Sequence, residues 1–72
     1  MTKKRGKQLV QEGHYLAEVD VDLIETDDAW SPYLSPDDAR KLDEVRRALQ
    51  REDTLAASRL ARVYQLTPIH AA

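Results

Sequence analysis

Cysteine and phenylalanine are both absent from this chain of 72 residues, and glycine occurs only twice. Without cysteine the chain can form no disulfide, and metal sites built on thiolates are excluded. One Trp and three Tyr are the only aromatic residues, so a core must consist mainly of Leu, Val and Ala. Such a core supplies only about 3–5 kcal/mol in a chain this short. We therefore expect association to add stability, and the lack of cysteine favours a cytoplasmic location.

Long apolar runs and catalytic motifs are missing as well. No apolar stretch approaches the roughly 18 residues of a membrane span, and none follows the basic start as an export signal would require. His14 and His70 are too few for a metal site, and no serine lies in a nucleophile motif. We therefore expect a non-enzymatic protein with no cofactor, no metal, no membrane partner and no small-molecule substrate.

Charge is segregated along the chain although the net charge is only −2. Residues 1–11 carry four basic side chains and no acid, whereas residues 12–28 carry seven acids and no Lys or Arg. An exposed segment of that acidity would repel nucleic-acid phosphates. We expect a flexible basic tail over residues 1–6, a single domain over 7–69 and a frayed C-terminus over 70–72.

Residues 14–26 alternate between apolar and polar side chains, which predicts a strand with one buried face. The apolar face comprises Tyr15, Ala17, Val19, Val21 and Leu23. Residues 7–11 form a shorter strand candidate, and Glu12-Gly13 between the two strands predicts a tight hairpin turn. In that register Val10 lies opposite Tyr15, although one residue of slip is allowed.

Two helices are predicted after a loop over residues 27–34. Residues 35–38 (Ser-Pro-Asp-Asp) combine a capping residue, a proline and two acids, which is typical of a helix start. That helix should run to about Arg51, and Asp53 should cap a second helix from Thr54 to about Tyr64. Residues 66–69 form an extended tail that would suit a short edge strand. The sequence therefore predicts an α+β fold of order β-β-α-α, with a C-terminal edge strand left open.

An acidic stripe on the predicted strand is the leading candidate for a functional surface. Glu18, Asp20 and Asp22 share the polar face, and Trp30 lies in the following loop. These four residues fit a docking surface for a basic protein partner, with Trp30 as an anchor. The simpler interpretation is that the acids form a solvated sheet face and that Trp30 covers the core.

Two alternatives belong to other functional classes. A structural or regulatory homodimer would bury Leu16, Ile24 and Trp30 against a second copy. A nucleic-acid-binding protein would instead need the N-terminal lysines and the helix arginines to converge on one face. The arginines concerned are Arg46, Arg47, Arg51, Arg59 and Arg62. Residues 54–68 are similar to the start of a helix-turn-helix, but too few residues follow to build a recognition helix.

The segments 15–26, 30–35, 41–46 and 59–64 together resemble a family of short, uncharacterised bacterial proteins. The resemblance extends over most of the chain, from His14 to Pro68. It implies a β-hairpin followed by two helices and assigns no catalytic residue. Because HicB-like antitoxins also pair a short sheet with a helix, the resemblance implies an antitoxin-like partner protein as one form of the interaction module.

Overall fold

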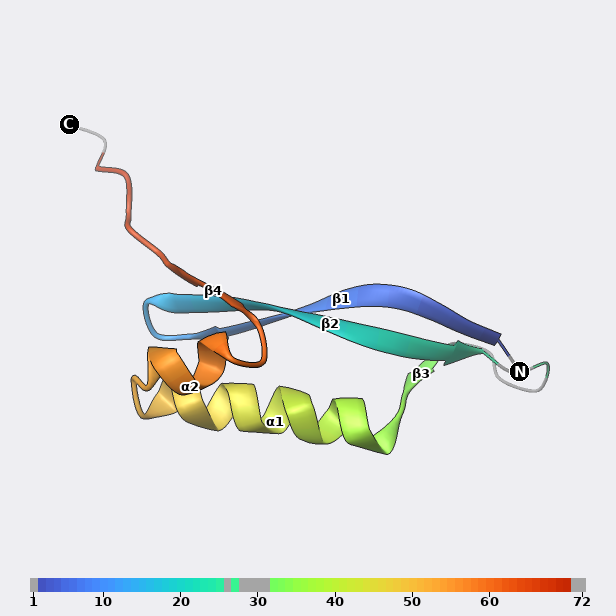
Figure 1. The fold of residues 1–72 in the computed structure, drawn as a ribbon. Helices are drawn as coiled ribbons and strands as arrows, with labels where there is room; N and C mark the ends of the chain where they lie inside the picture. Colours follow the sequence, from blue (N-terminus) through green and yellow to red (C-terminus); the bar gives the residue numbers. More distant parts are fainter. Residues whose placement is uncertain (1, 26, 28–31, 71–72) are drawn as a thin grey trace.

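The protein folds into a sheet with helices on one side, as the computed structural model shows for residues 2–25, 27 and 32–70 (Figure 1). The strands and helices follow in the order β1 (Thr2–Glu12), β2 (Tyr15–Glu25), β3 (Tyr33–Leu34), α1 (Pro36–Gln50), α2 (Thr54–Ser58) and β4 (Arg62–Gln65). The predicted α+β fold, with an N-terminal hairpin packed on two helices, is therefore confirmed. Trp30 lies outside the described residues.

The hairpin of β1 and β2 is an unbroken antiparallel ladder from Thr2↔Glu25 to Glu12↔Tyr15. Its two turn residues are Gly13 and His14, so the predicted Glu12-Gly13 turn is wrong by one position. Gly13 takes the first turn position with φ +59°, as a type II′ hairpin turn requires. The register moves by two residues as a result, which leaves every side chain on its predicted face.

Strand β1 begins five residues earlier than predicted. Residues 2–6 belong to the ladder, where the sequence analysis places a flexible basic tail. Strand β2 continues to Glu25 and gives two of these residues acidic neighbours across the ladder. Arg5 lies opposite Asp22, and Lys4 Nζ lies 3.6 Å from Glu25 Oε1. The N-terminal cations are therefore part of the sheet.

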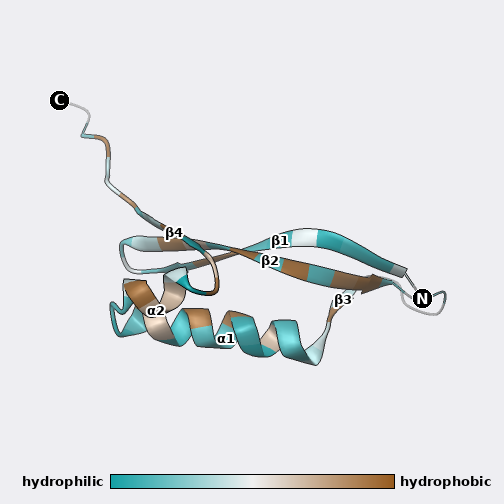
Figure 2. Cartoon of the chain, viewed as in Figure 1, coloured by the Kyte–Doolittle hydropathy of each residue, from teal (hydrophilic) through white to brown (hydrophobic). Residues whose placement is uncertain are grey.

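The core lies between the sheet and α1. Ala17, Val19 and Val21 of β2 are buried, as their alternation predicts, and Figure 2 shows apolar and polar segments alternating along that strand. Val45 and Leu49 of α1 are buried in the same cluster. The remaining members are Val10, Ala48 and Ala57. No polar or charged residue is buried among the described residues, so the core is entirely aliphatic.

The start of α1 agrees with the prediction. Ser35 Oγ accepts a hydrogen bond from the N–H of Asp38 at 3.1 Å, and Pro36 lies in the first turn. The Asp38 carboxylate then accepts the backbone N–H of Asp22 at 2.7 Å. This contact ties the helix start to β2 and satisfies a backbone donor that has no strand partner there.

The second helix is shorter than predicted. α2 ends at Ser58, and Arg62–Gln65 form β4, where the sequence analysis continues the helix to about Tyr64. β4 pairs antiparallel with β2, placing Val63 opposite the buried Ala17. The helix prediction is wrong there because the free edge of β2 offers a ladder to an alternating segment. The expected C-terminal edge strand is thus present, but it precedes residues 66–69.

Sheet order leaves β1 and part of β2 with free edges, in addition to the short outward edges of β3 and β4. β1 has a neighbour on one side only, while β2 pairs with β3 at Leu23–Ile24 and with β4 at Tyr15–Glu18 on its other side. Within the described residues, the outward edge of β1 therefore has no strand partner along its whole length. Residues 19–22 of β2 form a second, shorter gap between β4 and β3.

Replacing Leu49 should test the aliphatic core. Leu49 is 2% exposed, so Leu49→Ala should cost about 2–5 kcal/mol of unfolding free energy through lost burial and a residual cavity. Leu55→Ala is the matched control, because Leu55 is 69% exposed on α2, and it should change stability by less than about 0.5 kcal/mol. Urea denaturation followed by circular dichroism measures both, and equal losses would contradict this packing.

Candidate functional site

The face of the sheet opposite α1 and α2 is the candidate site, and it is called the outer face below. Side chains alternate between the two faces of a strand, and Ala17, Val19 and Val21 point to the helices. The even-numbered residues of β2 and their cross-strand partners therefore lie on the outer face. Neither helix covers it in the part of the chain shown in Figure 1.

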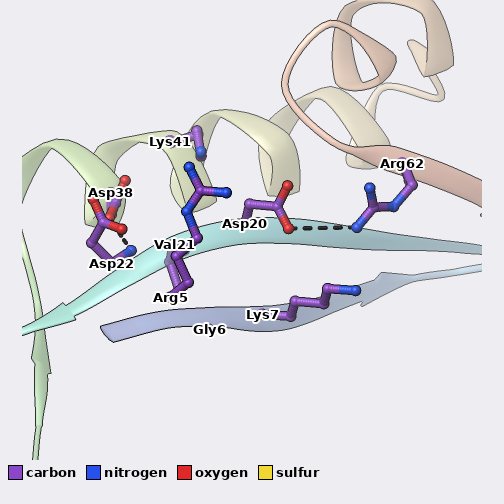
Figure 3. A pocket seen from close by; sticks show the side chains of 9 residues that line it. All are labelled: Arg5, Gly6, Lys7, Asp20, Val21, Asp22, Asp38, Lys41 and Arg62. Carbon is purple, nitrogen blue, oxygen red and sulfur yellow. Dashed lines mark hydrogen bonds and ion pairs between the residues drawn. The ribbon is translucent and has the colours of Figure 1, made fainter. Parts of the chain in front are cut away.

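Glu18 is the centre of an ion cluster on this face. Arg62 of β4 donates from Nε at 2.9 Å and from Nη2 at 2.5 Å to the same carboxylate oxygen of Glu18. Lys7 Nζ approaches that oxygen from β1 at 3.3 Å, and Arg62 Nη2 also lies 3.4 Å from Asp20 Oδ1. Figure 3 shows Arg62 directed toward Asp20. The cluster therefore joins β1, β2 and β4 by charge.

Hydrogen bonding by Arg62, and secondly by Lys7, lowers the pKa of the Glu18 carboxyl below its usual value of 4.5. The same contact with Glu18 raises the pKa of the Arg62 guanidinium. The Glu18 side chain is 25% exposed, so solvent screens the pair only in part.

The predicted acidic stripe is charge-balanced in three dimensions. Glu18, Asp20 and Asp22 do share the outer face, as their spacing predicts. Four cations lie on the same face: Lys3, Arg5, Lys7 and Arg62. The three acids thus do not form a bare acidic surface, and their contact with a basic partner stays a prediction.

An apolar patch lies beside the ion cluster, toward the hairpin turn. The patch, called the turn-end patch, consists of Leu9, Leu16, Tyr64 and Leu66. Leu16 lies directly opposite Tyr64, and Leu9 is its diagonal neighbour on β1. The N–H of Leu66 donates to the carbonyl of His14 at 2.6 Å, which extends the β4 ladder onto the tail. Leu9 is 63% and Tyr64 49% exposed, so the patch faces solvent.

Sequence reasoning found only part of this patch. Leu16 stands out as an apolar interruption of the polar face and was assigned to a homodimer contact. Leu9 is likewise an apolar residue on the polar face, because the predicted and the observed registers differ by two residues and both place Leu9 there. Tyr64 is not predicted on this face because the expected second helix runs to about Tyr64, and Leu66 is not predicted there because the expected extended tail over residues 66–69 has no assigned neighbour. Ile24, a second of the three predicted dimer contacts, lies opposite Tyr33 at the far end of the outer face.

A shallow depression of about 490 Å³ lies at the gap in the β2 edge (Figure 3). Its lining combines four cations with three carboxylates: Arg5, Lys7, Lys41 and Arg62 with Asp20, Asp22 and Asp38. Gly6 and Val21 complete it. Because side chains of both charges line the depression, it does not favour a ligand of one charge. Asp38 and Arg62 are in addition already bound to neighbouring groups there.

The predicted nucleic-acid-binding arginines converge only in part. Arg47, Arg51 and Arg59 line a second depression of about 400 Å³ between the helices. Arg47 is paired with Asp43 at 3.0 Å, and Arg51 lies 3.8 Å from Asp53. The other two point elsewhere: Arg46 toward Glu12, and Arg62 into the outer-face cluster. The five arginines therefore form no continuous basic surface.

Comparisons with known proteins found no matching family model, curated protein or solved structure. Within residues 2–25, 27 and 32–70, no group of three or more His, Asp or Glu side chains is placed to hold a metal ion. Over those same ranges, no helix has the length and apolar character to cross a membrane. The resemblance to short bacterial proteins stays a prediction.

Glu18→Gln should show how much the negative charge of Glu18 contributes to stability, because glutamine keeps nearly the same shape without the charge. Because the folded-state pKa of Glu18 is lowered, its carboxylate stabilises the fold above the unfolded-state value of about 4.5, and this contribution is lost as pH falls through the folded-state pKa. The variant should therefore be less stable than wild type at about pH 7 and should lose less stability on acidification to about pH 3. Denaturation at both pH values measures the effect.

Glu44→Gln serves as the control for this experiment, because Glu44 is exposed on α1 and makes no ion pair among the described residues. It should follow the wild-type pH dependence. A Glu18→Gln variant with an unchanged loss of stability on acidification would show that the cluster does not stabilise the fold.

Proposed function

We propose that this protein is a non-enzymatic protein-interaction module that binds a partner protein through the turn-end patch on its outer face. The observation that carries the proposal is the exposure of Leu9, Tyr64 and Leu66 around the partly buried Leu16, on a sheet face that neither helix covers. Contiguous apolar surface of this kind, bordered by charged groups, marks interaction sites in small proteins.

The patch has the composition of a binding hot spot. Tyr64 offers a large amphipathic ring, which contributes strongly to interfaces because it buries much area with few rotatable bonds. The neighbouring Glu18, Lys7 and Arg62 side chains give the patch a polar border. Such a border excludes water from an apolar centre and contributes mainly to the specificity of the contact.

The charged part of the outer face extends the proposed contact. Asp20, at the border of the ion cluster, and Asp22, beyond it, are exposed and fit a polar rim around the patch. The sequence predicts docking through Glu18, Asp20, Asp22 and Trp30. We centre the contact on the apolar patch instead, because the three acids share their face with cations and support binding less directly. An antitoxin-like role is one form of this proposal, with a toxin as the partner.

A double variant, Leu9→Ser with Tyr64→Ser, should abolish partner binding while leaving the core intact. Both side chains are about half exposed or more, so their removal takes apolar area from the interface rather than from the core. The tagged wild type and variant would be used to capture proteins from an extract of the source cells. Quantitative mass spectrometry should show one protein enriched by wild type and lost from the variant.

Leu55→Ser is the matched control, because Leu55 is equally apolar and exposed but lies on α2, in the helix layer. It should retain the captured protein, and circular dichroism should show all variants folded. Retention of that protein by the double variant, or its loss from Leu55→Ser alone, would place the contact on another surface.

A further inference from the structure

We propose that the free edge of β1 binds an acidic extended segment of a partner protein by strand addition. This inference rests on the proposed function, because it specifies how the partner engages the outer face. It assigns the recognition chemistry to backbone groups of β1 and to the cations that alternate along it.

The direction of the backbone groups follows from the contact at Asp22. The N–H of Asp22 donates to Asp38 of α1, so it points away from β1. Backbone N–H and C=O groups of a given strand residue point to the same side and alternate along the chain. The antiparallel partner of Asp22 is Arg5, whose own N–H and C=O must therefore point away from β2.

The same alternation gives a row of outward backbone groups on β1. They belong to the odd-numbered residues of the strand: Lys3, Arg5, Lys7, Leu9 and Gln11. The register is continuous over these positions, with no bulge to interrupt the edge. Within the described residues no strand or helix pairs with them. Such an edge is a template for one more strand.

The charge of the edge selects the occupant. Lys3, Arg5 and Lys7 lie at alternate positions on the outer face, and Lys3 and Arg5 make no ion pair among the described residues. A residue directly opposite in an added strand has its Cβ atom about 4.5–5.5 Å away, close enough for ion pairing. Glu or Asp at every second position of the segment would therefore face these cations.

Leu9 continues the row of outward positions and belongs to the turn-end patch. An added strand would place an apolar side chain beside Leu9 and so enlarge the patch by one strand width. The occupant is thus an alternating segment with acids opposite residues 3–7 and an apolar residue opposite Leu9. A second copy fits less well, because the only acid of its β1 strand is Glu12, which already contacts Arg46 and Gln50.

The test uses the full chain and a fluorescent peptide of alternating Glu and Val in which Val replaces the Glu opposite Leu9, with the corresponding Lys-Val peptide as the charge control. Fluorescence anisotropy should show binding of the Glu-Val peptide that weakens with added salt and no comparable binding of the Lys-Val peptide. Leu9→Pro removes an outward N–H without touching the ladder to β2, whereas Leu9→Ser removes the same side chain and keeps that N–H. Leu9→Pro should bind the peptide about fivefold more weakly than Leu9→Ser.

Amide NMR of the wild type supplies a readout that needs no variant. The Glu-Val peptide should protect the N–H groups of Lys7 and Leu9 from exchange, while those of Gln8 and Val10, already paired with β2, should change little. Equal binding by the two Leu9 variants, or absence of both binding and protection, would overturn the strand-addition proposal. Binding of Lys-Val as tightly as Glu-Val would overturn the assigned charge.

Two further outcomes distinguish strand addition by a partner from self-association and from the proposed function. A wild-type dimer in light scattering that Leu9→Pro, but not Leu9→Ser, converts to a monomer would assign the edge to a second copy and overturn the acidic occupant. Loss of the captured protein on Tyr64→Ser, with no peptide binding to the edge, would leave the proposed function standing and reject only the strand addition.

Discussion

Burial of one face of β2 under α1 is the contact on which the remaining structure depends. Ala17, Val19 and Val21 meet Val45 and Leu49 in a core whose fully buried members, among the residues the structure describes, are all aliphatic, so each of these side chains contributes a large share of the buried area. Because that core is small and has only one layer of helices over it, the sheet must keep its other face toward solvent. The outer face, with its patch and its ion cluster, is a direct consequence.

Polar contacts then fix the relative placement of the two layers. Ser35 caps α1 and Asp38 uses its carboxylate to receive the N–H of Asp22, so a single helix start satisfies both its own backbone and that of a neighbouring strand. The Glu18–Arg62 ion pair links β2 to β4 on the outer face of the sheet. Each of these contacts contributes only modestly to stability.

Local patterns in the sequence were sufficient for much of the fold. The alternation over β2 predicts its buried face, and Ser35 with Pro36 predicts the start of α1, because both signals are read from neighbouring residues. The identity of β4 was not accessible in this way, since residues 62–65 suit a helix and become a strand only against the free edge of β2. The extension of β1 to Thr2 likewise depends on partners that lie about twenty residues away.

The candidate site was harder to predict for the same reason. Glu18, Asp20 and Asp22 were correctly placed on one face, but the ion pairs of Glu18 and Asp20 with Arg62 join residues 44 and 42 positions apart in the sequence. A charge count along the chain cannot reveal a pairing of that separation. The turn-end patch is assembled from β1, β2, β4 and the residue that follows β4, and only its members on β1 and β2 carry a signal in the sequence.

The brevity of β4 has a kinetic consequence. Four residues with one half-buried side chain, Val63, hold it to β2, whereas eleven register pairs join β1 to β2. Segments with few buried contacts open with less free energy than the global fold, so β4 should detach and return while the hairpin and α1 stay intact. Each such opening would release Arg62 and Tyr64 together and expose the edge of β2. The lifetime of the closed state would then set how long the complete outer face is presented to a partner.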